Sequence, residues 1–335
     1  MVKMKKRKLG KTGVEIPEMG MGCWAIGGVG YGPVSERDAM STLEVAWESG
    51  VRFFDTADTY GEGRSESLVG QFLKSKRRDE AVIATKAGVD FYPAAVWQKS
   101  STQIAATGHK KNFHPDYIQF ACEQSLKRLG VECIDFYQLH NPNLENLKKT
   151  EIFETVLKLK QSGKIRFAGL SLHTVEEATW ALENLPVDSL QLIYNILDQR
   201  MRLNVFPLAQ KKGVAIIVRE PLASGLLTGK YDARAEFSKD DHRRRFSREK
   251  LAADCQKIEK IKDLLVPRIT ISQVALQFAL ADSAVSVIIP GSKKTEQALQ
   301  NGQAVTGSTL TEEVINRLQS LFDSDPLFRQ HLLPS

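Results

Sequence analysis

The stretch FFDTADTYGEGRSESLVG, Phe53 to Gly70, links a buried strand to an amphipathic helix through a polar loop. Two phenylalanines lead into Asp55, glycines mark the loop, and a helical pattern begins near Ser65. A strand followed by a loop and a helix is the repeating unit of α/β proteins with a parallel sheet. The same order recurs along most of the chain.

Eight short apolar segments with strand character alternate with longer amphipathic segments. The strand candidates cover 18–23, 51–56, 81–86, 133–140, 165–171, 188–194, 214–218 and 284–290. Helical patterns between them begin near Ser35, His114, Thr174 and Ile271. Eight strand–helix units predict a (β/α)8 barrel, the TIM barrel, in one domain over residues 1–335.

A doubly wound sheet is the alternative, since it uses the same alternation with fewer strands. Such a sheet carries phosphate-binding glycines at its first strand–helix turn, and GMGCWA at 20–25 does spell GxGxxA. A second glycine-rich loop follows this match instead of a helix, so we interpret the match as coincidental. No internal repeat or low-complexity linker indicates a domain boundary.

Two further features fit a barrel. The opening segment KRKLGKTGVEIPEM, 6–19, predicts a β-hairpin that closes the bottom of the barrel. Segments of roughly 87–113 and 221–248 are too long for tight connections. Both follow strands, so we expect them at the C-terminal face, where barrels carry their chemistry.

The composition is that of an ordinary globular protein, with a net charge of +6 over 335 residues. Basic residues are scattered, and no basic face interleaved with aromatic residues indicates nucleic-acid binding. The cluster HRRRF, 242–246, predicts a solvated loop, with a contact to an anionic cofactor as the alternative. No segment suits a secretory signal or a membrane span, and the four cysteines lack metal-like spacing. We therefore expect a cytoplasmic protein without a bound metal.

Four polar residues stand at or just after the ends of predicted strands: Asp55, Tyr60, Lys86 and His140. Taken singly, each has an ordinary interpretation as a turn former, a solvated side chain or a structural hydrogen-bond partner. In a barrel, however, the C-terminal ends of the strands meet at one mouth, so these side chains would converge.

This set of groups suits the reduction of a carbonyl by hydride transfer, which leaves an oxygen that must be protonated. A tyrosine can donate that proton, and a nearby ammonium lowers its pKa from about 10. We expect Lys86 to be this ammonium, with Asp55 holding it charged and Tyr60 acting as the general acid. A neutral His140 can hydrogen-bond the substrate oxygen and orient it.

Longer stretches make the chain resemble the aldo-keto reductase superfamily over essentially its full length. They are Phe53–Gly70, ATKAG at 84–88, IDFYQLHNPN at 134–143, KIRFAGLS at 164–171, PLASGLLTGKY at 221–231 and IIPGSKKTEQALQN at 288–301. The resemblance favours the branch of bacterial NADP-dependent oxidoreductases and potassium-channel β-subunits. It implies a (β/α)8 barrel, reversible NAD(P)H-dependent carbonyl reduction, and a catalytic tetrad of Tyr60, Lys86, Asp55 and His140.

The resemblance also implies where a nicotinamide cofactor binds. The implied contacts are Gly22, Cys23, Trp24, Asp55, Ser171, Gln191, Arg219, Pro221, Leu222, Gly225, Leu227, Gly291, Ser292, Lys293, Gln297 and Asn301. Ser171 and Gln191 would hold the carboxamide, although both also suit ordinary turn or strand-edge hydrogen bonds. Relatives commonly carry an asparagine after the serine, where this chain has Leu172, so one polar contact is missing.

Relatives often stack an aromatic side chain on the nicotinamide just after the seventh strand, where this chain has Arg219. A planar guanidinium can stack on a ring, but its charge disfavours the cationic, oxidised nicotinamide. We therefore hypothesise that Arg219 lies near the ring, paired with Glu220, and biases the enzyme toward reduction. A surface ion pair between Arg219 and Glu220 is the alternative.

The phosphate groups of the cofactor are expected on two segments. Small residues within Pro221–Lys230 allow the backbone to approach a pyrophosphate closely. A helix predicted to start near Lys294 offers free N–H groups to an anion. Lys293 stands where relatives bind the 2′-phosphate of NADP, and Gln297 and Asn301 would face the adenine. We favour NADP(H) over NAD(H) on this basis, with simple solvation of both lysines as the alternative.

Loops at the barrel mouth would contact the substrate, among them Trp24–Pro33, 87–113 and the C-terminal tail. Phe91, Tyr92 and Trp97 indicate a partly apolar pocket for a small aldehyde or ketone. A nucleotide-sensing accessory subunit with slow or vestigial reductase activity is the alternative function. The complete tetrad favours the enzyme, and the resemblance leaves a homo-oligomer open.

Overall fold

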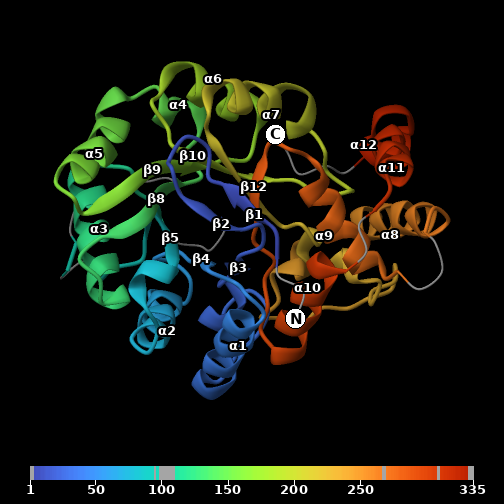
Figure 1. Cartoon of the computed structure of the whole chain (residues 1–335), viewed down its shortest axis with the longest axis horizontal. Helices are drawn as coiled ribbons and strands as arrows, with labels where there is room; N and C mark the ends of the chain where they lie inside the picture. The colour runs from blue at the N-terminus through green and yellow to red at the C-terminus, as the bar shows by residue number, and fades with distance from the viewer. Residues whose placement is uncertain (1–3, 94–95, 98–109, 266–268, 308–309, 331–335) are drawn as a thin grey trace.

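Eight parallel strands form the centre of the molecule, and helices surround them (Figure 1). The computed structural model describes residues 4–93, 96–97, 110–265, 269–307 and 310–330. The strands are β3 (Met21–Gly22), β4 (Phe53–Asp55), β5 (Val82–Ala87), β8 (Ile134–His140), β9 (Ile165–Ser171), β10 (Ser189–Ile193), β11 (Ala215–Arg219) and β12 (Val285–Ile288). Their order in the sheet is β12-β11-β10-β9-β8-β5-β4-β3, and each of the eight matches a predicted strand.

The two edge strands of this sheet, β3 and β12, meet and close the barrel. Parallel β-bridges join Met19 to Ile288 and Gly22 to Gly291, and the Gly20 N–H donates to the Ile288 carbonyl at 2.8 Å. A Cβ atom on Gly22 would lie 2.8 Å from the Ile289 carbonyl oxygen, so only glycine fits there. The structure therefore confirms the TIM barrel. Of the two glycines in the GxGxxA match, Gly22 serves this close strand contact, whereas a Cβ atom on Gly20 would lie 2.7 Å from the Phe53 carbonyl oxygen of β4.

Helices follow the strands and cover the outside of the barrel. They are α1 (Glu36–Glu48), α2 (Arg64–Leu73), α3 (Pro115–Leu129), α4 (Leu144–Leu147), α5 (Thr150–Gln161), α6 (Val175–Asn184), α7 (Met201–Lys212), α8 (Arg248–Lys262), α9 (Ile271–Ala281), α10 (Thr295–Thr306), α11 (Glu312–Ser324) and α12 (Pro326–Arg329). Ser35, near which the sequence predicts a helix to begin, caps α1: its side chain accepts from the Asp38 N–H. Short elements in the loops are η1 (Ala25–Gly27), η2 (Arg78–Glu80), β6 (Val89–Asp90), β7 (Lys110–Lys111), η3 (Ala223–Thr228) and η4 (His242–Arg245).

The N-terminal hairpin closes the bottom of the barrel, as the sequence predicts. Strands β1 (Lys6–Lys8) and β2 (Glu15–Pro17) pair antiparallel. The Arg7 guanidinium donates to the Val285 carbonyl at 2.9 Å, at the start of β12. Leu9 and Ile16 are buried in one apolar cluster with barrel side chains such as Phe53. The hairpin thus seals the end opposite the C-terminal ends of the strands.

Strand alternation determines which side chains enter the barrel. Phe53, Ala84 and Phe136 belong to the interior apolar cluster, and the residue two positions further along each strand shares its face. These second residues are polar: Asp55, Lys86 and Gln138. The barrel is therefore apolar toward its base and polar toward its mouth.

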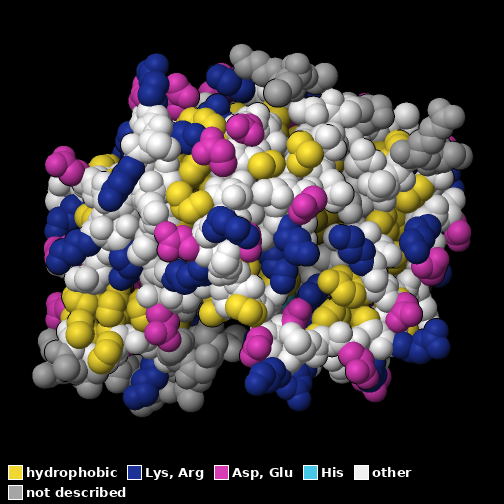
Figure 2. Space-filling view, turned by 90° about the horizontal axis from the view of Figure 1, so that it is seen from below, with side chains coloured by type: hydrophobic (Ala, Val, Ile, Leu, Met, Phe, Trp, Pro, Cys, Tyr) yellow, Lys and Arg dark blue, Asp and Glu magenta, His cyan; other side chains and the backbone are white. Residues whose placement is uncertain are grey.

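The outer surface carries charges of both signs. On the face shown in Figure 2, basic and acidic side chains are interspersed and do not form one continuous patch. No helix in the described part of the chain is both long enough and apolar enough to cross a bilayer.

Truncating Leu9 tests how much the hairpin contributes to the barrel. Leu9 has no exposed surface, so Leu9→Ala should lower the free energy of unfolding by about 2–5 kcal/mol. Urea denaturation followed by circular dichroism measures this change. Lys8→Ala is the matched control, since Lys8 is exposed, and should change the free energy by less than about 0.5 kcal/mol. Equal effects of the two substitutions would contradict a sealing role for the hairpin.

Candidate active site

The four residues expected to converge do so at the C-terminal ends of β4, β5 and β8. The Lys86 ammonium donates to Asp55 Oδ1 at 2.6 Å, to the Thr56 carbonyl at 2.8 Å and to the Tyr60 hydroxyl at 3.2 Å. The rings of Tyr60 and His140 meet edge to face, with centroids 6.0 Å apart. The side chains of Lys86 and Asp55 are only 1% and 3% exposed, which places this ion pair inside the protein.

Burial and charge set the protonation states of this cluster. Burial by itself would lower the pKa of Lys86, but the Asp55 carboxylate and the Tyr60 oxygen raise it above its ordinary value, so the amine is an ammonium. Burial lowers the pKa of His140 well below its ordinary value, and the nearby Lys86 and Arg219 charges lower it further. His140 is therefore neutral at physiological pH, as expected.

The pKa of Tyr60 departs from the sequence-based expectation. Burial raises the pKa of this phenol, and the Lys86 ammonium lowers it without cancelling the effect of burial. The prediction of a net lowering was therefore wrong for this structure, since it weighed the charge but not the desolvation. The consequence is a Tyr60 that keeps its proton across neutral pH.

The first loop of the barrel covers Tyr60 with an aromatic side chain. The Trp24 ring stacks on the Tyr60 ring, with centroids 6.1 Å apart and an interplanar angle of 28°. A Cβ atom on Gly30 would lie 2.6 Å from the Trp24 ring, so this glycine makes room for it. The His242 ring, 4.7 Å from that of Trp24, packs on it from η4. Of the other two predicted contacts in this loop, Cys23 is fully buried and Gly22 lies in the strand contact described above.

Two predicted carboxamide ligands, Ser171 and Gln191, lie beside the tetrad but bind protein groups. Gln191 Nε2 donates to Asp55 Oδ2 at 2.7 Å. The Ser171 hydroxyl donates to Asn141 Oδ1 at 3.1 Å. Asn141 follows His140 directly and has a positive φ of 58°, which turns the chain out of β8. Its side-chain amide therefore lies next to Ser171.

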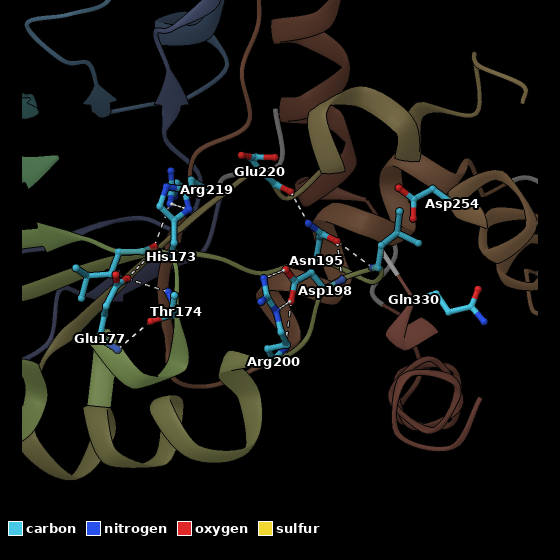
Figure 3. Close-up of polar contacts among 12 residues, drawn as sticks. His173, Thr174, Glu177, Asn195, Asp198, Arg200, Arg219, Glu220, Asp254 and Gln330 are labelled. Atoms are coloured by element: carbon cyan, nitrogen blue, oxygen red, sulfur yellow. Dashed lines mark hydrogen bonds and ion pairs between the residues drawn. The ribbon is translucent and has the colours of Figure 1, made fainter. Parts of the chain in front are cut away.

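Arg219 extends from the end of β11 toward His173 (Figure 3). Its Nη2 lies 3.0 Å from the Leu172 carbonyl, 3.3 Å from Asn141 Oδ1 and 3.1 Å from His173 Nδ1. Burial lowers the pKa of His173 to about 3, and the Arg219 charge lowers it in the same direction. His173 is thus neutral, and its Nδ1 accepts from the guanidinium.

The expected pairing of Arg219 with Glu220 is wrong. Glu220 has a positive φ of 54°, and its carboxylate accepts from the Ser224 hydroxyl at 2.9 Å. The turn at Glu220 separates its side chain from the guanidinium. The Arg219 partners come instead from the ends of β8 and β9, which no pattern near position 219 indicates.

The predicted phosphate-binding residues after β12 lie together at the start of α10. Lys293 donates through Nζ to the Tyr31 carbonyl at 2.6 Å, and Gln297 accepts from the Lys293 N–H at 2.9 Å. Asn301 Nδ2 donates to the Ser292 hydroxyl at 3.1 Å. No side chain caps the N-terminus of α10. Its first N–H groups therefore remain available to an anion.

The segment after β11 supplies the remaining predicted contacts. Pro221 and Leu227 are buried, Leu222 is half-buried, and Gly225 has a positive φ of 89° that suits glycine. Farther along, the His242 N–H donates to the Gly30 carbonyl at 2.8 Å, which ties η4 to the first loop.

The prediction of a solvated loop for HRRRF is only partly correct. Arg244 and Arg245 are exposed, but Arg243 is buried. Arg243 pairs with Asp241 at 2.5 Å, and its guanidinium lies over the Tyr31 ring. Charge alone indicated solvation, whereas the aromatic neighbours that accept this arginine come from distant segments.

The loop expected to line the substrate pocket is described only in part. Residues 94–95 and 98–109 and the tail 331–335 lie outside the described residues. Tyr92 and Trp97 pack against α3: the Trp97 ring stacks on Phe120, and Arg128 donates to the Tyr92 hydroxyl at 2.8 Å. These two aromatic residues thus anchor the loop to a helix.

Two residues in this cluster, Asn141 and His173, were absent from the sequence-based prediction. The asparagine in HNPN directly after a strand-end histidine was a usable signal, because Asn is one of the residues that tolerate a positive φ. His173 offered only its proximity to Leu172, the position already noted as unusual. In the described part of the chain, no group of His, Cys, Asp and Glu side chains is arranged to hold a metal ion.

Comparison with known proteins assigns a family to this arrangement. Residues 18–323 match the model of the Aldo/keto reductase family. The chain is 33% identical over 334 residues to the uncharacterized oxidoreductase YqkF of Bacillus subtilis (strain 168), covering 98% of this chain and 99% of that protein. It is 32% identical over 304 residues to the NADP(+) aldo-keto reductase yakc of Schizosaccharomyces pombe, covering 88% and 85%. It is 31% identical over 334 residues to the NADH-specific methylglyoxal reductase of Escherichia coli (strain K12), covering 94% and 100%.

A solved structure agrees with these sequence matches. The aldo-keto reductase AKR11C1 from Bacillus halodurans, in its holo form, superposes with a TM-score of 0.78 at 30% identity. The match covers 95% of this chain and 96% of that chain. The chain belongs to the aldo/keto reductase family of NAD(P)H-dependent oxidoreductases.

Proposed function

We propose that the protein is an NADPH-dependent carbonyl reductase that converts small aldehydes or ketones to alcohols. The observation that carries this proposal is the buried Lys86 ammonium in simultaneous contact with Asp55 and the Tyr60 hydroxyl. A structural lysine would need only its acidic partner. An ammonium that also contacts a half-buried phenol is suited to proton donation at that phenol.

Each tetrad residue has a distinct role in the proposed reaction. Tyr60 gives its hydroxyl proton to the carbonyl oxygen as that oxygen becomes the alcohol, and the Lys86 ammonium stabilises the phenolate left behind. Asp55 holds Lys86 charged. Neutral His140 donates a hydrogen bond to the carbonyl oxygen and so orients it. A dihydronicotinamide, held by residues such as Ser171 and Gln191, would supply the hydride that the carbonyl carbon accepts.

The residues around the mouth fit a dinucleotide. The uncapped N-terminus of α10 provides backbone donors suited to a phosphate group. Gly225, with its positive φ and no side chain, allows a phosphate to approach the backbone closely. Ser171, Gln191 and Asn141 form an amide- and hydroxyl-bearing group that suits a carboxamide. The proposed contacts are those given above for the first loop, β9 to β11, Pro221–Leu227 and Gly291–Asn301.

We infer a preference for NADP(H) from Lys293. Its ammonium, half-buried beside the start of α10, is the cation best situated for a 2′-phosphate. Relatives of similar identity differ on this point, since one is named for NADP(+) and another is NADH-specific. The residue at 293 therefore has to be tested directly.

We infer that Arg219 lies beside the nicotinamide subsite and biases the enzyme toward reduction. Support comes from its contacts with Asn141 and His173, which hold the guanidinium near His140. A fixed positive charge there opposes the cationic, oxidised ring more than the neutral, reduced ring.

The alternative is a nucleotide-sensing accessory subunit with vestigial activity. The Lys86 ammonium in contact with both Asp55 and the Tyr60 hydroxyl favours the enzyme, because a sensor does not need a complete tetrad. A panel of small aldehydes, sugars and quinones with NADPH distinguishes the two. Tight NADPH binding with negligible turnover of every compound would favour the sensor.

Removing the Tyr60 hydroxyl should abolish the proton donor without removing the pocket. Tyr60→Phe is expected to lower kcat/KM for NADPH-dependent aldehyde reduction by about 10²- to 10⁴-fold while the NADPH dissociation constant stays unchanged. Stopped-flow absorbance and fluorescence titration give the two quantities. Tyr194→Phe is the matched control: this buried phenol packs on Phe206 and Phe278, and its loss should leave kcat/KM as it is.

Neutralising Lys293 should separate the two cofactors. Lys293→Ala is expected to weaken NADPH binding by about ten- to a hundredfold, the usual effect of losing a charge-assisted hydrogen bond, and to leave NADH binding unchanged. Fluorescence titration with both cofactors measures this, with Lys294→Ala, an exposed neighbour, as the control. Equal weakening of NADPH and NADH would rule out a contact with the 2′-phosphate.

Replacing Arg219 by an aromatic residue should shift the balance of the two reaction directions. Arg219→Tyr removes the charge beside the nicotinamide subsite, so NADP⁺ should bind more tightly relative to NADPH and the ratio of oxidation to reduction rates should rise. Titration with each cofactor form and initial rates in both directions test this. Unchanged affinities and an unchanged ratio would eliminate the proposed role.

A further inference from the structure

The Gln191 side chain reaches across the inside of the barrel. It belongs to β10, and in the sheet order β9, β8 and β5 separate β10 from β4, which carries Asp55. Gln191 Nε2 nevertheless lies 2.7 Å from Asp55 Oδ2, and both residues are almost completely buried. A hydrogen bond between nearly opposite sides of the barrel connects the catalytic side of the mouth with the proposed nicotinamide side.

This bond completes the hydrogen bonding of the Asp55 side chain. Lys86 donates to Oδ1 and Gln191 donates to Oδ2, so each carboxylate oxygen has one strong donor. A carboxylate with one partner can rotate about its Cβ–Cγ bond, since that torsion is broad. With a donor on each oxygen the plane of the carboxylate is fixed. Buried donors that orient a functional group in this way commonly change activity when they are removed.

We propose that Gln191 is a positioning residue of the tetrad, whose amide fixes the Asp55 carboxylate so that its other oxygen faces the Lys86 ammonium. The proposal rests on the proposed reductase function and adds a role to the carboxamide contact expected for Gln191. The two roles are compatible, because Nε2 serves Asp55 while Oε1 remains an acceptor for a ligand amide.

The charged and titratable groups around Asp55 come from several elements. Lys86 from β5 contacts it, Tyr60 follows it in the loop after β4, and Cys23 lies at the end of β3. Burial raises the pKa of the Cys23 thiol, which is therefore neutral. His140 and Arg219 act on the cluster from β8 and β11. A negative charge introduced at position 191 would thus act chiefly on Lys86 and Tyr60.

The pair Gln191→Glu and Gln191→Leu tests the proposal. In the Glu variant two carboxyl groups in contact share one proton at low pH, which preserves the donor to Asp55. As the pH rises the shared proton is lost, and the second negative charge makes Tyr60 harder to ionise. At saturating NADPH, kcat of this variant should fall about tenfold between pH 6 and 9 relative to wild type. The Leu variant, with no donor at any pH, should lose about ten- to a hundredfold in kcat throughout.

Gln138→Leu is the matched control, because it makes the same change in another buried glutamine on a barrel strand. No described residue hydrogen-bonds the Gln138 amide, so the substitution removes no hydrogen bond to the tetrad, although Gln138 is the register partner of Lys86 on the neighbouring strand. Its kcat and pH profile should remain those of wild type. If Gln191→Leu fails to fold, the pH profile of kcat for Gln191→Glu is sufficient to test the proposal.

A second readout does not depend on turnover. Ionisation of Tyr60 is followed by tyrosinate absorbance, with Tyr60→Phe versions subtracted as background, and should move to higher pH by about one unit in Gln191→Glu. If Gln191 served only the cofactor, both variants would weaken NADPH binding while this titration and the kcat profile stayed at their wild-type values, and the proposal would be wrong. Failure of the reductase function itself is distinguishable, because wild type would then reduce no carbonyl while the Tyr60 titration still reported on position 191.

Discussion

The ion pair between Lys86 and Asp55 lies where almost no water reaches either group. Bringing two charges into such a place costs several kcal/mol per ion, and their attraction offsets this only when the geometry and the remaining hydrogen bonds are good. Here the ammonium has three oxygen partners, and the carboxylate has a donor on each oxygen. The site is thus organised before any ligand arrives, and the phenol of Tyr60 lies beside a fixed positive charge.

The apolar interior of the barrel lies below this ion pair and keeps water away from it. Apolar side chains such as Phe53 and Phe136 fill the lower part of the interior, and the hairpin closes it with Leu9 and Ile16. Below the tetrad there is consequently little water or polar material to screen the charges of Lys86 and Asp55. The same desolvation lowers the pKa of His140 and raises the pKa of Tyr60, so one physical cause acts on both groups in the direction of their neutral forms.

Sequence reasoning was strongest where local patterns decide the outcome. Short apolar runs located all eight barrel strands. The polar residues at the strand ends were expected to converge, because in a closed parallel barrel those ends meet at one mouth. Sequence reasoning was weakest where partners come from distant segments. Gln191 on Asp55, Arg219 on His173 and Arg243 over Tyr31 are contacts between loops or strands far apart in the chain, and no local pattern encodes them. The net pKa of Tyr60 was missed for a related reason, since burial is a property of the whole fold.

The close contact between β3 and β12 at Gly22 limits which substitutions this strand tolerates. Gly22 lets the two backbones touch, and any larger residue there would push against the Ile289 carbonyl. Such a change would displace β3 from β12. Because β3 leads directly into Cys23 and Trp24, the displacement would also move the Trp24 ring that covers Tyr60. Changes in ligand preference are therefore expected outside this strand, because a substitution within it would disturb the barrel closure and the aromatic cover of Tyr60 together.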